Sequence, residues 1–382
     1  MIEPFASRAA PRLVFGPGAL RDLPNYVRET GASAVFLVTD PGIARAGHVE
    51  TARVLLTHAG VDVTVFDQTQ ENPTEHDVAL CCEAARGARF ECFVALGGGS
   101  SMDTAKACNF LLTNGGQMRD YHGYGKATRP MLPFIAIPTT SGTGSECQSY
   151  ALVSRDDTHE KMACGDPKAR AHIALLDPEL AATQPRSVAV LTGLDALSHA
   201  LESAVSTKKN PLSSVYAEAS FRHLAGALGP ILAERATLED FGQMQLGAAL
   251  AGLAIENSML GAAHAAANPL TARHHVIHGH AIGIMLPAVL SFNAETDAAR
   301  SVYARFSEIL REKGVSEQPL LAWVDDLIRA CALPSLDRRS LDFSTLAHEA
   351  SLQWTGKFNP RPLQPADFVA LYQRAFSFDA RG

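Results

Sequence analysis

One carboxylate and several imidazoles are spaced as the ligands of a divalent metal ion would be. Asp195 and His199 lie four residues apart in a segment with helical periodicity, so both side chains fall on one helix face, with Cβ atoms about 5–6 Å apart. Two further candidates are His264, in an alanine-rich segment, and His278, which precedes Gly279. One carboxylate oxygen and three imidazole nitrogens suit a first-row divalent metal, and an open coordination position could take the oxygen of a substrate.

Each of these residues also has a purely structural interpretation. An aspartate and a histidine four apart often form a surface ion pair, although the apolar and small neighbours of Asp195 and His199 argue against exposure. A histidine in an alanine-rich helix, such as His264, is commonly a hydrogen-bonded core residue. The stretch 274–280 holds four histidines, so composition alone does not select the ligand there. On the residues alone, the metal site is the favoured interpretation.

A second set of residues is arranged to hold a phosphate. Gly97-Gly98-Gly99-Ser100 follows an apolar run and opens a segment with helical periodicity. Three glycines let the backbone approach a pyrophosphate closely, and the N–H groups of a helix N-terminus point at it. The motif is not the GxGxxG fingerprint, and a tight strand-to-helix turn capped by Ser100 is the structural alternative.

Two other segments support a nucleotide site. Asp40 closes an earlier strand-like run, where a carboxylate can bind an adenosine ribose and repel a 2′-phosphate, which favours NAD over NADP. An ordinary turn aspartate before Pro41-Gly42 is the alternative there. The stretch 138–146 follows another strand-like run and offers hydroxyl and N–H donors to a phosphate or ribose, although it could also be a flexible connector.

The elements that would carry these residues divide the chain into two halves. Short apolar runs alternate with helical patterns in the first half and predict a parallel sheet covered on both faces. The predicted strands are 34–38, 63–66, 92–96, 134–138 and 173–176, with helical spacing at 43–59 and 75–89. The predicted helices of the second half are 187–205, 212–228, 239–255, 281–294, 297–313 and 317–331. We expect an α/β, Rossmann-like dinucleotide-binding domain over residues 1–186 and an all-helical metal-binding domain over residues 187–382.

Composition excludes several classes of function. The 382 residues suit two domains, and the net charge of −7 argues against a nucleic-acid partner. The N-terminal segment lacks the apolar core of a signal peptide, and apolar runs long enough to span a membrane are missing, which predicts a cytoplasmic protein. The seven cysteines form no CxxC pair, which is typical of buried thiols in a reducing compartment.

The chain resembles the iron-containing (group III) alcohol dehydrogenases nearly from end to end. The likeness begins at Phe15-Gly16-Pro17-Gly18 and closes at Asn359-Pro360-Arg361-Pro362. Its most specific parts are Gly97-Gly98-Gly99-Ser100 with Asp103 and Lys106, the stretch 138–146, Lys161-Met162, Asp177-Pro178, Gly193-Leu194-Asp195-Ala196 with His199, then His264, and His278-Gly279.

The resemblance implies a dehydroquinate-synthase-like architecture, bound NAD and Fe²⁺, and a homodimer or higher homo-oligomer. Zn²⁺ is possible at the same ligands, because it binds such sites more tightly than Fe²⁺. The implied metal ligands are Asp195, His199, His264 and His278. The implied cofactor-binding residues are Asp40, Asn72, Gly97, Gly98, Gly99, Ser100, Asp103, Thr139, Thr140, Ser145 and Lys161.

One position departs from the family pattern. Members commonly carry a second histidine four residues after the third ligand, where it is thought to relay a proton, but this chain has Asn268. An amide can hydrogen-bond but does not titrate near neutral pH. His274, His275 or His280, the cofactor ribose or solvent could serve instead, so the catalytic proton carrier stays open.

The expected function is that of a metal-dependent, NAD(H)-linked alcohol dehydrogenase or aldehyde reductase, with a primary alcohol or aldehyde as its small-molecule substrate. A maleylacetate-type reductase and a glycerol-type polyol dehydrogenase are alternatives on the same scaffold. A dehydroquinate-synthase-like lyase and a catalytically silent binding protein are more distant ones. Arg273 and the histidines after it hint at an acidic aldehyde, but a polar loop facing solvent explains them equally well.

Overall fold

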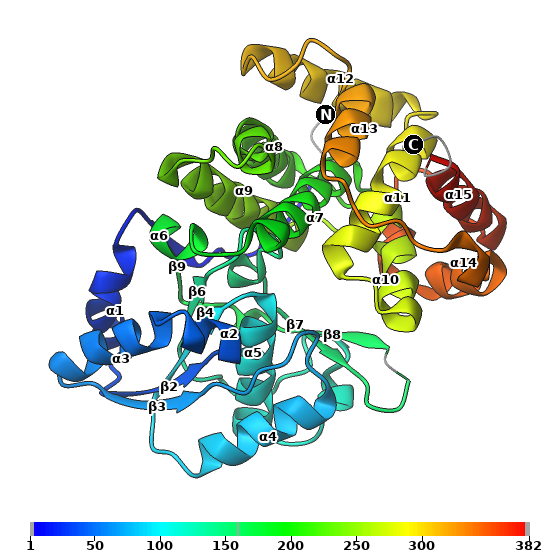
Figure 1. Ribbon diagram of the computed structural model, residues 1–382. Helices are drawn as coiled ribbons and strands as arrows, with labels where there is room; N and C mark the ends of the chain where they lie inside the picture. The colour runs from blue at the N-terminus through cyan, green and yellow to red at the C-terminus, as the bar shows by residue number, and fades with distance from the viewer. Residues whose placement is uncertain (1–3, 159, 379–382) are drawn as a thin grey trace. The chain divides into compact units, whose positions relative to one another are not determined.

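The computed structural model describes residues 4–158 and 160–378 (Figure 1). Residues 8–184 form one compact unit, and the described residues from 185 onward form a second one together with residues 4–7. The expected domains, 1–186 and 187–382, stay a prediction, because compactness alone does not show that each part folds independently.

A six-stranded parallel sheet organises the first unit. Its order is β1-β9-β6-β4-β2-β3. The strands are β1 (Arg12–Phe15), β2 (Ala34–Val38), β3 (Asp62–Phe66), β4 (Cys92–Gly97), β6 (Phe134–Pro138) and β9 (Ile173–Leu176). Every residue of the four inner strands is buried, as a parallel sheet covered on both faces requires. The sequence therefore predicted the inner strands and β3 correctly but missed β1, a half-exposed edge strand.

Alternate residues of the inner strands enter two separate cores. Phe36, Val38, Phe93 and Ala95 belong to one core, whereas Val35, Leu37, Val94 and Leu96 belong to the other. The first core includes residues of α4 (Glu75–Arg86) and α5 (Gly99–Asn114). The second includes residues of α1 (Leu23–Glu29), α3 (His48–His58) and α6 (Pro178–Ala181). Helices thus cover both faces of the sheet.

The chain reverses its direction across the sheet between β2 and β4. It moves outward from β2 to β3, then returns to pair β4 with the other side of β2. In open parallel sheets, ligands bind outside the carboxyl ends of the strands at such a switch point. The carboxyl ends of β2 and β4 carry Asp40 and the glycine turn, so topology brings these two sequence features together.

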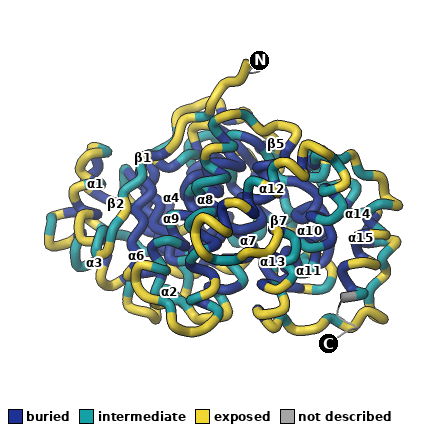
Figure 2. The backbone as a smooth tube through the Cα atoms, turned by 90° about the horizontal axis from the view of Figure 1, so that it is seen from above, coloured by how far each residue is buried: buried dark blue, intermediate teal, exposed yellow. Residues whose placement is uncertain are grey.

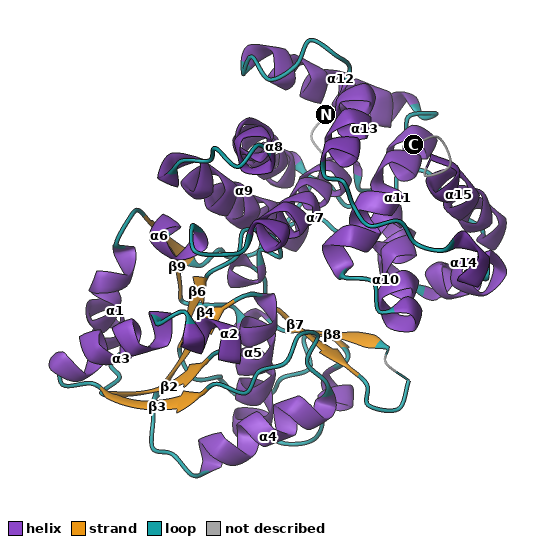
Figure 3. Ribbon diagram, in the orientation of Figure 1, coloured by secondary structure: helices purple, strands orange, loops and turns teal. Residues whose placement is uncertain are grey.

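Two further features of the first unit differ from the sequence prediction. The segment 43–59 is not one helix, because α2 (Pro41–Arg45) ends before Gly47, whose φ of 85° breaks the helical path before α3. A small second sheet, ordered β5-β8-β7, was also missed. It is formed by β5 (Gly123–Tyr124), β7 (Tyr150–Ser154) and β8 (Lys161–Gly165). Figure 3 shows that the strands of the described residues all lie in this unit.

The second unit is helical throughout its described residues. It contains α7 (Arg186–Val205), α8 (Pro211–Leu232), α9 (Leu238–Glu256), α10 (Ala262–His274), α11 (His278–Asn293), α12 (Asp297–Glu312), α13 (Leu320–Ala330), α14 (Phe343–Leu352) and α15 (Pro365–Phe378). Among the described helices, α7 alone is long and apolar enough to cross a membrane, but 83% of its apolar window is buried. It is therefore packed as a core helix (Figure 2). The predicted all-helical second half is confirmed, and the structure adds α10, α14 and α15 to the predicted ranges.

Candidate metal centre and nucleotide site

Four predicted ligands of the second unit converge on one point. Asp195 and His199 project from successive turns of α7, His264 lies in the first turn of α10, and His278 is the first residue of α11. The Nε2 atoms of His199 and His264 lie 3.0 Å apart, and each is 3.4 Å from Asp195 Oδ1. His278 Nε2 is 3.6 Å from the same oxygen. Side chains from three helices are thus brought together.

The separations between these atoms fit the coordination sphere of a metal ion. An ion about 2.1 Å from each ligand would space neighbouring ligand atoms about 3.0–3.4 Å apart, the edge of an octahedron or tetrahedron. Asp195 Oδ1 is buried and makes no hydrogen bond of normal geometry, although three ring nitrogens surround it. The ligand atoms of Asp195, His199 and His264 all lie within 4.8 Å of one another, and these residues are 4–5% exposed. His278 is the more open member, with 23% of its side chain exposed.

The electrostatics of this cluster favour a cation. Burial opposes a charge on Asp195, but the adjacent imidazoles of His199, His264 and His278 outweigh burial and lower the pKa of the carboxyl below its usual range. Burial would likewise lower the pKa of His264, but the charges of Glu202 and Asp195 raise that pKa to about 9. A buried group that holds a proton so strongly in the absence of metal lies in a negative potential.

Glu202 is a member of this site that the sequence analysis did not single out. Its Oε2 lies 2.5 Å from Nδ1 of His264, and its Oε1 accepts a hydrogen bond of 2.7 Å from the backbone N–H of Ala263. Glu202 follows Asp195 by seven residues and His199 by three, so all three share one face of α7. That spacing was visible in the sequence and could have identified Glu202.

Close packing of α11 on α7 positions His278. A Cβ atom added to Gly279 would lie 2.1 Å from the backbone oxygen of Leu191, so only glycine permits this approach. His278 occupies the first position of α11, one residue before this contact. The pair His278-Gly279 therefore combines a ligand-type side chain with the residue that lets its helix approach α7.

The structure separates His278 from the other histidines of the stretch 274–280. His275 is exposed and ends α10 in the left-handed conformation, with φ 53°. Among these histidines, only His278 has a contact with Asp195 given by the structure. Arg273 forms an exposed ion pair with Glu349, so its charge is already balanced. The hint of an acidic aldehyde that Arg273 gave stays a prediction.

Asn268 is held by a second amide. It lies one helical turn beyond His264 on α10, and its Nδ2 donates a hydrogen bond of 2.9 Å to Oε1 of Gln353. The position is partly exposed. Neither amide titrates near neutral pH, so this pair can orient a polar group but cannot carry a proton.

The glycine turn of the first unit lies where β4 meets α5. A Cβ on Gly97 would lie 2.4 Å from Ser101 Oγ, and one on Gly99 would lie 2.7 Å from Thr143 Cγ2, so both close approaches need glycine. The N-cap of α5 is Gly98, with no side-chain cap. Ser100 is therefore not the cap that the structural alternative assumed. An uncapped helix N-terminus offers its N–H groups to an anion.

Asp40 lies beside this turn. Its Oδ1 accepts hydrogen bonds from the backbone N–H groups of Gly42 and Ile43, which caps α2. Its Oδ2 lies 3.3 Å from the Cβ position of Gly97. The residue is thus both the turn aspartate of the structural alternative and a carboxylate at the switch point of the sheet.

A buried lysine fixes the end of the predicted loop 138–146 through hydrogen bonds. Lys106, only 1% exposed, donates from Nζ to the carbonyl and hydroxyl oxygens of Ser145 and to the carbonyls of Gln148 and Tyr150. Ser145 Oγ in turn donates to Asp103 Oδ1 at 2.9 Å. Burial raises the pKa of Asp103 to about 6, with Lys106 opposing the rise. Asp103 and Ser145 thus support the loop from its buried side.

The remaining loop residues lie next to the glycine turn. Thr139 donates its backbone N–H to the carbonyl of Gly97 at 3.0 Å. The hydroxyl of Thr140 lies 3.5 Å from the Cβ position of Gly98. Both threonines are therefore close enough to the turn to share a phosphate ligand with it.

Asn72 connects the glycine turn with β8. It adopts the left-handed conformation, with φ 53°. Its backbone N–H donates to Ser100 Oγ at 3.2 Å, and its Oδ1 accepts from Lys161 Nζ at 3.1 Å. The structure therefore brings Asn72, Ser100 and Lys161 together.

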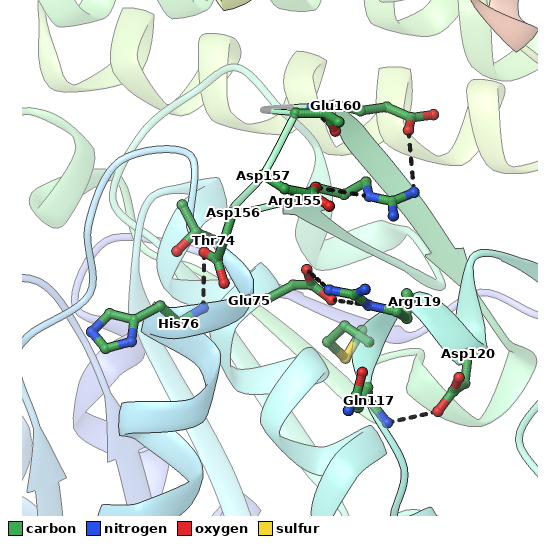
Figure 4. Close-up of polar contacts among 12 residues, drawn as sticks. Thr74, Glu75, His76, Gln117, Arg119, Asp120, Arg155, Asp156, Asp157 and Glu160 are labelled. Atoms are coloured by element: carbon green, nitrogen blue, oxygen red, sulfur yellow. Dashed lines mark hydrogen bonds and ion pairs between the residues drawn. The ribbon is translucent and has the colours of Figure 1, made fainter.

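Polar contacts fix the β7–β8 hairpin that carries Lys161 (Figure 4). The backbone N–H of His76, in α4, donates to Asp156 at 3.3 Å, and Arg155 pairs with Glu160 across the hairpin. Arg119 binds both carboxylate oxygens of Glu75 at the start of α4. Among these contacts, the hydrogen bond between His76 and Asp156 joins the hairpin to the first turn of α4, which follows Asn72 in the chain.

Comparisons with known proteins agree with this geometry. The model of the iron-containing alcohol dehydrogenase family matches residues 10–178, and the model of the C-terminal domain of the Fe-containing alcohol dehydrogenase family matches residues 189–376. Alcohol dehydrogenase 4 of Saccharomyces cerevisiae is 31% identical over 371 residues, covering 95% of this chain and 96% of that protein.

Two further similarities cover different lengths of the chain. The NAD-dependent methanol dehydrogenase of Bacillus methanolicus is 31% identical over 79% of each chain. The crystal structure of a 1,3-propanediol oxidoreductase superimposes with a TM-score of 0.91, at 27% identity, over 98% of this chain and 100% of the other.

Proposed function

The chain belongs to the iron-containing alcohol dehydrogenase family, and on that premise we propose that Asp195, His199, His264 and His278 hold its metal ion. The protein is an NAD-dependent alcohol dehydrogenase that interconverts an alcohol and an aldehyde by hydride transfer. The observation that carries the assignment of ligands is the convergence of three ring nitrogens on one buried carboxylate oxygen.

A divalent ion held by these residues supplies the Lewis acid that polarises the oxygen of the alcohol or aldehyde. Asp195 contributes the charged ligand, and the three imidazoles contribute neutral ones. Burial of Asp195, His199 and His264 excludes water from one side of the site, while the more exposed His278 lies on its open side. The four side chains thus leave a direction from which a substrate can approach.

The dinucleotide is assigned to the switch point of the sheet. We propose that Gly97, Gly98 and Gly99 accept the pyrophosphate at the uncapped start of α5, with Ser100, Thr139 and Thr140 beside it. The proposed contacts of Asp40 are with the adenosine ribose, where its charge disfavours a 2′-phosphate. Asn72 and Lys161 are the remaining residues proposed to bind the dinucleotide. Asp103 and Ser145 stabilise the buried side of the loop 138–146 through their hydrogen bond.

We do not propose Asn268 as the group that carries the proton of the reaction. The Asn268–Gln353 pair supports a role in orienting the substrate, because its amides hydrogen-bond without titrating. The cofactor ribose or solvent would then carry the proton. A primary alcohol or aldehyde is the proposed substrate class. The four converging ligand-type residues favour a metal-dependent enzyme over a metal-independent maleylacetate-type reductase.

Further proposals concern the ion, the assembly and the location. Fe²⁺ is the proposed working ion, and Zn²⁺ is a competitor because N₃O sites bind it more tightly. A homodimer or higher homo-oligomer and a cytoplasmic location are also proposed. The buried thiols support a reducing compartment, since all seven cysteines are buried.

Activity and metal content, measured on the same sample, test this proposal. Protein purified without oxygen should contain about one metal ion per chain and oxidise NADH in the presence of short aldehydes. Chelation should abolish the activity, and Fe²⁺ or Zn²⁺ should restore it. Steady turnover in protein free of metal would overturn the metal-dependent mechanism.

A further inference from the structure

We propose that Glu202 is a positioning residue of the metal centre, which fixes the tautomer and orientation of His264 and balances the charge of a bound divalent ion. The inference rests on the proposed metal site, to which it adds a residue that does not contact the ion. Glu202 is 3% exposed and lies on the same face of α7 as Asp195 and His199.

The hydrogen bonds of Glu202 determine which nitrogen of His264 carries a proton. A carboxylate oxygen accepts hydrogen bonds, which makes His264 Nδ1, 2.5 Å from Oε2, the donor of this contact. In a neutral imidazole the proton on Nδ1 leaves a lone pair on Nε2. That nitrogen faces His199 and Asp195, at 3.0 and 3.4 Å. Glu202 therefore keeps His264 in the tautomer that can bind a metal ion through Nε2.

The second carboxylate oxygen of Glu202 fixes where His264 lies. Oε1 accepts from the backbone N–H of Ala263, within the first turn of α10. Asn359 Oδ1 accepts from the N–H of the preceding Ala262 at 3.3 Å. A Cβ on Gly261 would lie 3.0 Å from both Glu202 Oε1 and Asn359 Oδ1. The start of α10, and with it His264, is thus attached to two side chains from other segments.

Charge provides the third argument. Asp195 and Glu202 are both buried carboxylates next to His264. Buried charges persist where an opposite charge compensates them. Two carboxylates and three neutral imidazoles leave two negative charges, which a divalent ion cancels. Asp195 alone would leave a bound divalent ion with an excess positive charge.

Replacement of Glu202 by glutamine separates these functions from simple packing. Glutamine fills nearly the same volume but has one acceptor oxygen and one NH₂ donor. If its oxygen accepts from Ala263, its NH₂ faces His264 Nδ1 and selects the wrong tautomer. If the amide is reversed, its NH₂ faces the N–H of Ala263. Neither orientation both accepts from the N–H of Ala263 and keeps the proton of His264 on Nδ1.

The test is the dissociation constant for Co²⁺ of the full-length apoprotein, measured by competition with a chelator, together with the visible absorption of the bound ion. We expect Glu202→Gln to bind Co²⁺ about 10- to 100-fold more weakly than the wild-type protein. In ¹⁵N-histidine-labelled apoprotein it should also lose the downfield Nδ1–H signal of His264. A glutamine variant with wild-type affinity, absorption and Nδ1–H signal would overturn the role of Glu202.

Ser203→Ala is the matched control. Ser203 is buried beside Glu202 on α7, and its hydroxyl donates to the carbonyl of Ala200 within the same helix. We expect it to bind Co²⁺ with wild-type affinity, and a loss as large as that of Glu202→Gln would reduce the effect to packing and overturn the proposal. Circular dichroism of each apoprotein shows whether it folds.

Glu202→Asp keeps the charge but is one methylene too short to reach both Ala263 and His264, so it should bind more weakly than wild type. It also serves as the test if the glutamine variant fails to fold, and unchanged binding in it would count against the proposal. Failure of the wild-type protein itself to bind Co²⁺ would instead overturn the proposed metal centre, so the two failures are distinguishable.

Discussion

The Nε2 atoms of His199 and His264 lie 3.0 Å apart, although the two residues are 65 positions apart in the chain and belong to different helices. If both rings are neutral and Glu202 accepts the Nδ1–H of His264, a lone pair of His264 faces His199. Either a proton on one of the two rings or a cation between them relieves this contact, and the pKa of His264, raised to about 9 by Glu202 and Asp195, favours a proton on His264 as long as no cation is bound. The folded chain is therefore arranged to gain free energy when a metal ion binds.

The first prediction concerns thermal stability. A ligand that binds only the folded state stabilises it by about 2.7 kcal/mol at 100-fold excess over its dissociation constant. For a protein of this size that corresponds to a rise in the melting temperature of about 3–4 °C. Calorimetry of apoprotein with and without Zn²⁺ measures the rise. His199→Ala should abolish it, and a shift of equal size in that variant would place the ion elsewhere.

The second prediction distinguishes two neighbouring histidines. His278→Ala should lower kcat/KM for aldehyde reduction by at least about 100-fold and remove bound metal. Replacing a residue that only hydrogen-bonds to a metal ligand already lowers metal affinity or activity about 10- to 100-fold, so loss of a ligand itself should cost more. His275→Asn is the control, since His275 is exposed and asparagine tolerates its left-handed backbone. Equal losses in both variants would show that the loop as a whole, rather than His278, supports the site.

The third prediction tests how α11 is placed. Gly279→Ala puts a methyl group against the backbone of Leu191, which cannot rotate away, so we expect about 1–3 kcal/mol of destabilisation and weaker metal binding. Gly226→Ala is the control on α8, where the nearest atom to the added Cβ is 3.6 Å away on a flexible lysine. It should be neutral or stabilise by up to about 1 kcal/mol. Urea unfolding and metal titration of both variants provide the measurements.

The fourth prediction concerns the choice of dinucleotide. Asp40→Asn keeps an acceptor for the N-cap of α2 but removes the negative charge. The ratio of kcat/KM for NADPH to that for NADH should rise about tenfold, as expected for about 1–2 kcal/mol of lost repulsion. Asp62→Asn, at the amino end of β3, is the control. An unchanged ratio in Asp40→Asn would exclude Asp40 from the ribose site.

The fifth prediction is a pH dependence of stability. Burial raises the pKa of Glu146 to about 7, above the value of about 4.3 of an unfolded chain. The folded state therefore binds more protons between these values, and stability should fall as pH rises from about 4.5 to about 7. Asp103, with a pKa raised to about 6 by burial, acts in the same direction.

Glu146→Gln removes one of these two titrations. The loss of unfolding free energy between about pH 5 and about pH 8 should shrink by up to about 3 kcal/mol, measured by urea unfolding. The same substitution at Glu83, exposed on α4, is the control. A pH dependence that is as steep in Glu146→Gln as in wild type would show that Glu146 ionises as it would in water.

Local pattern was sufficient for much of the fold. The inner strands are continuous apolar runs, which few other elements resemble, and the helical spacing of the sequence predicted α7, α8, α9, α11, α12 and α13. The hairpin of β7 and β8 mixes polar and apolar residues over five positions each, so it had no clear signal. The break in 43–59 could have been placed at Gly47, since glycine is a common end of helices.

The site was predictable where chemistry and spacing coincide, as for Asp195 and His199. Glu202 was within reach of the same argument, because it lies on their helix face. The role of Lys106 could not be predicted in this way. Its partners lie 39 to 44 residues away and are mostly backbone carbonyls, which no side-chain pattern encodes. Likewise, the approach of Gly279 to Leu191 depends on the packing of two helices.

Anomalous diffraction at the iron absorption edge, from crystals of protein reconstituted with Fe²⁺ without oxygen, locates the metal ion. We expect one strong peak per chain, about 2.0–2.2 Å from Asp195 Oδ1 and from the Nε2 atoms of His199, His264 and His278. A peak bound by other residues, or no peak in protein that reduces aldehydes at full rate, would contradict this expectation.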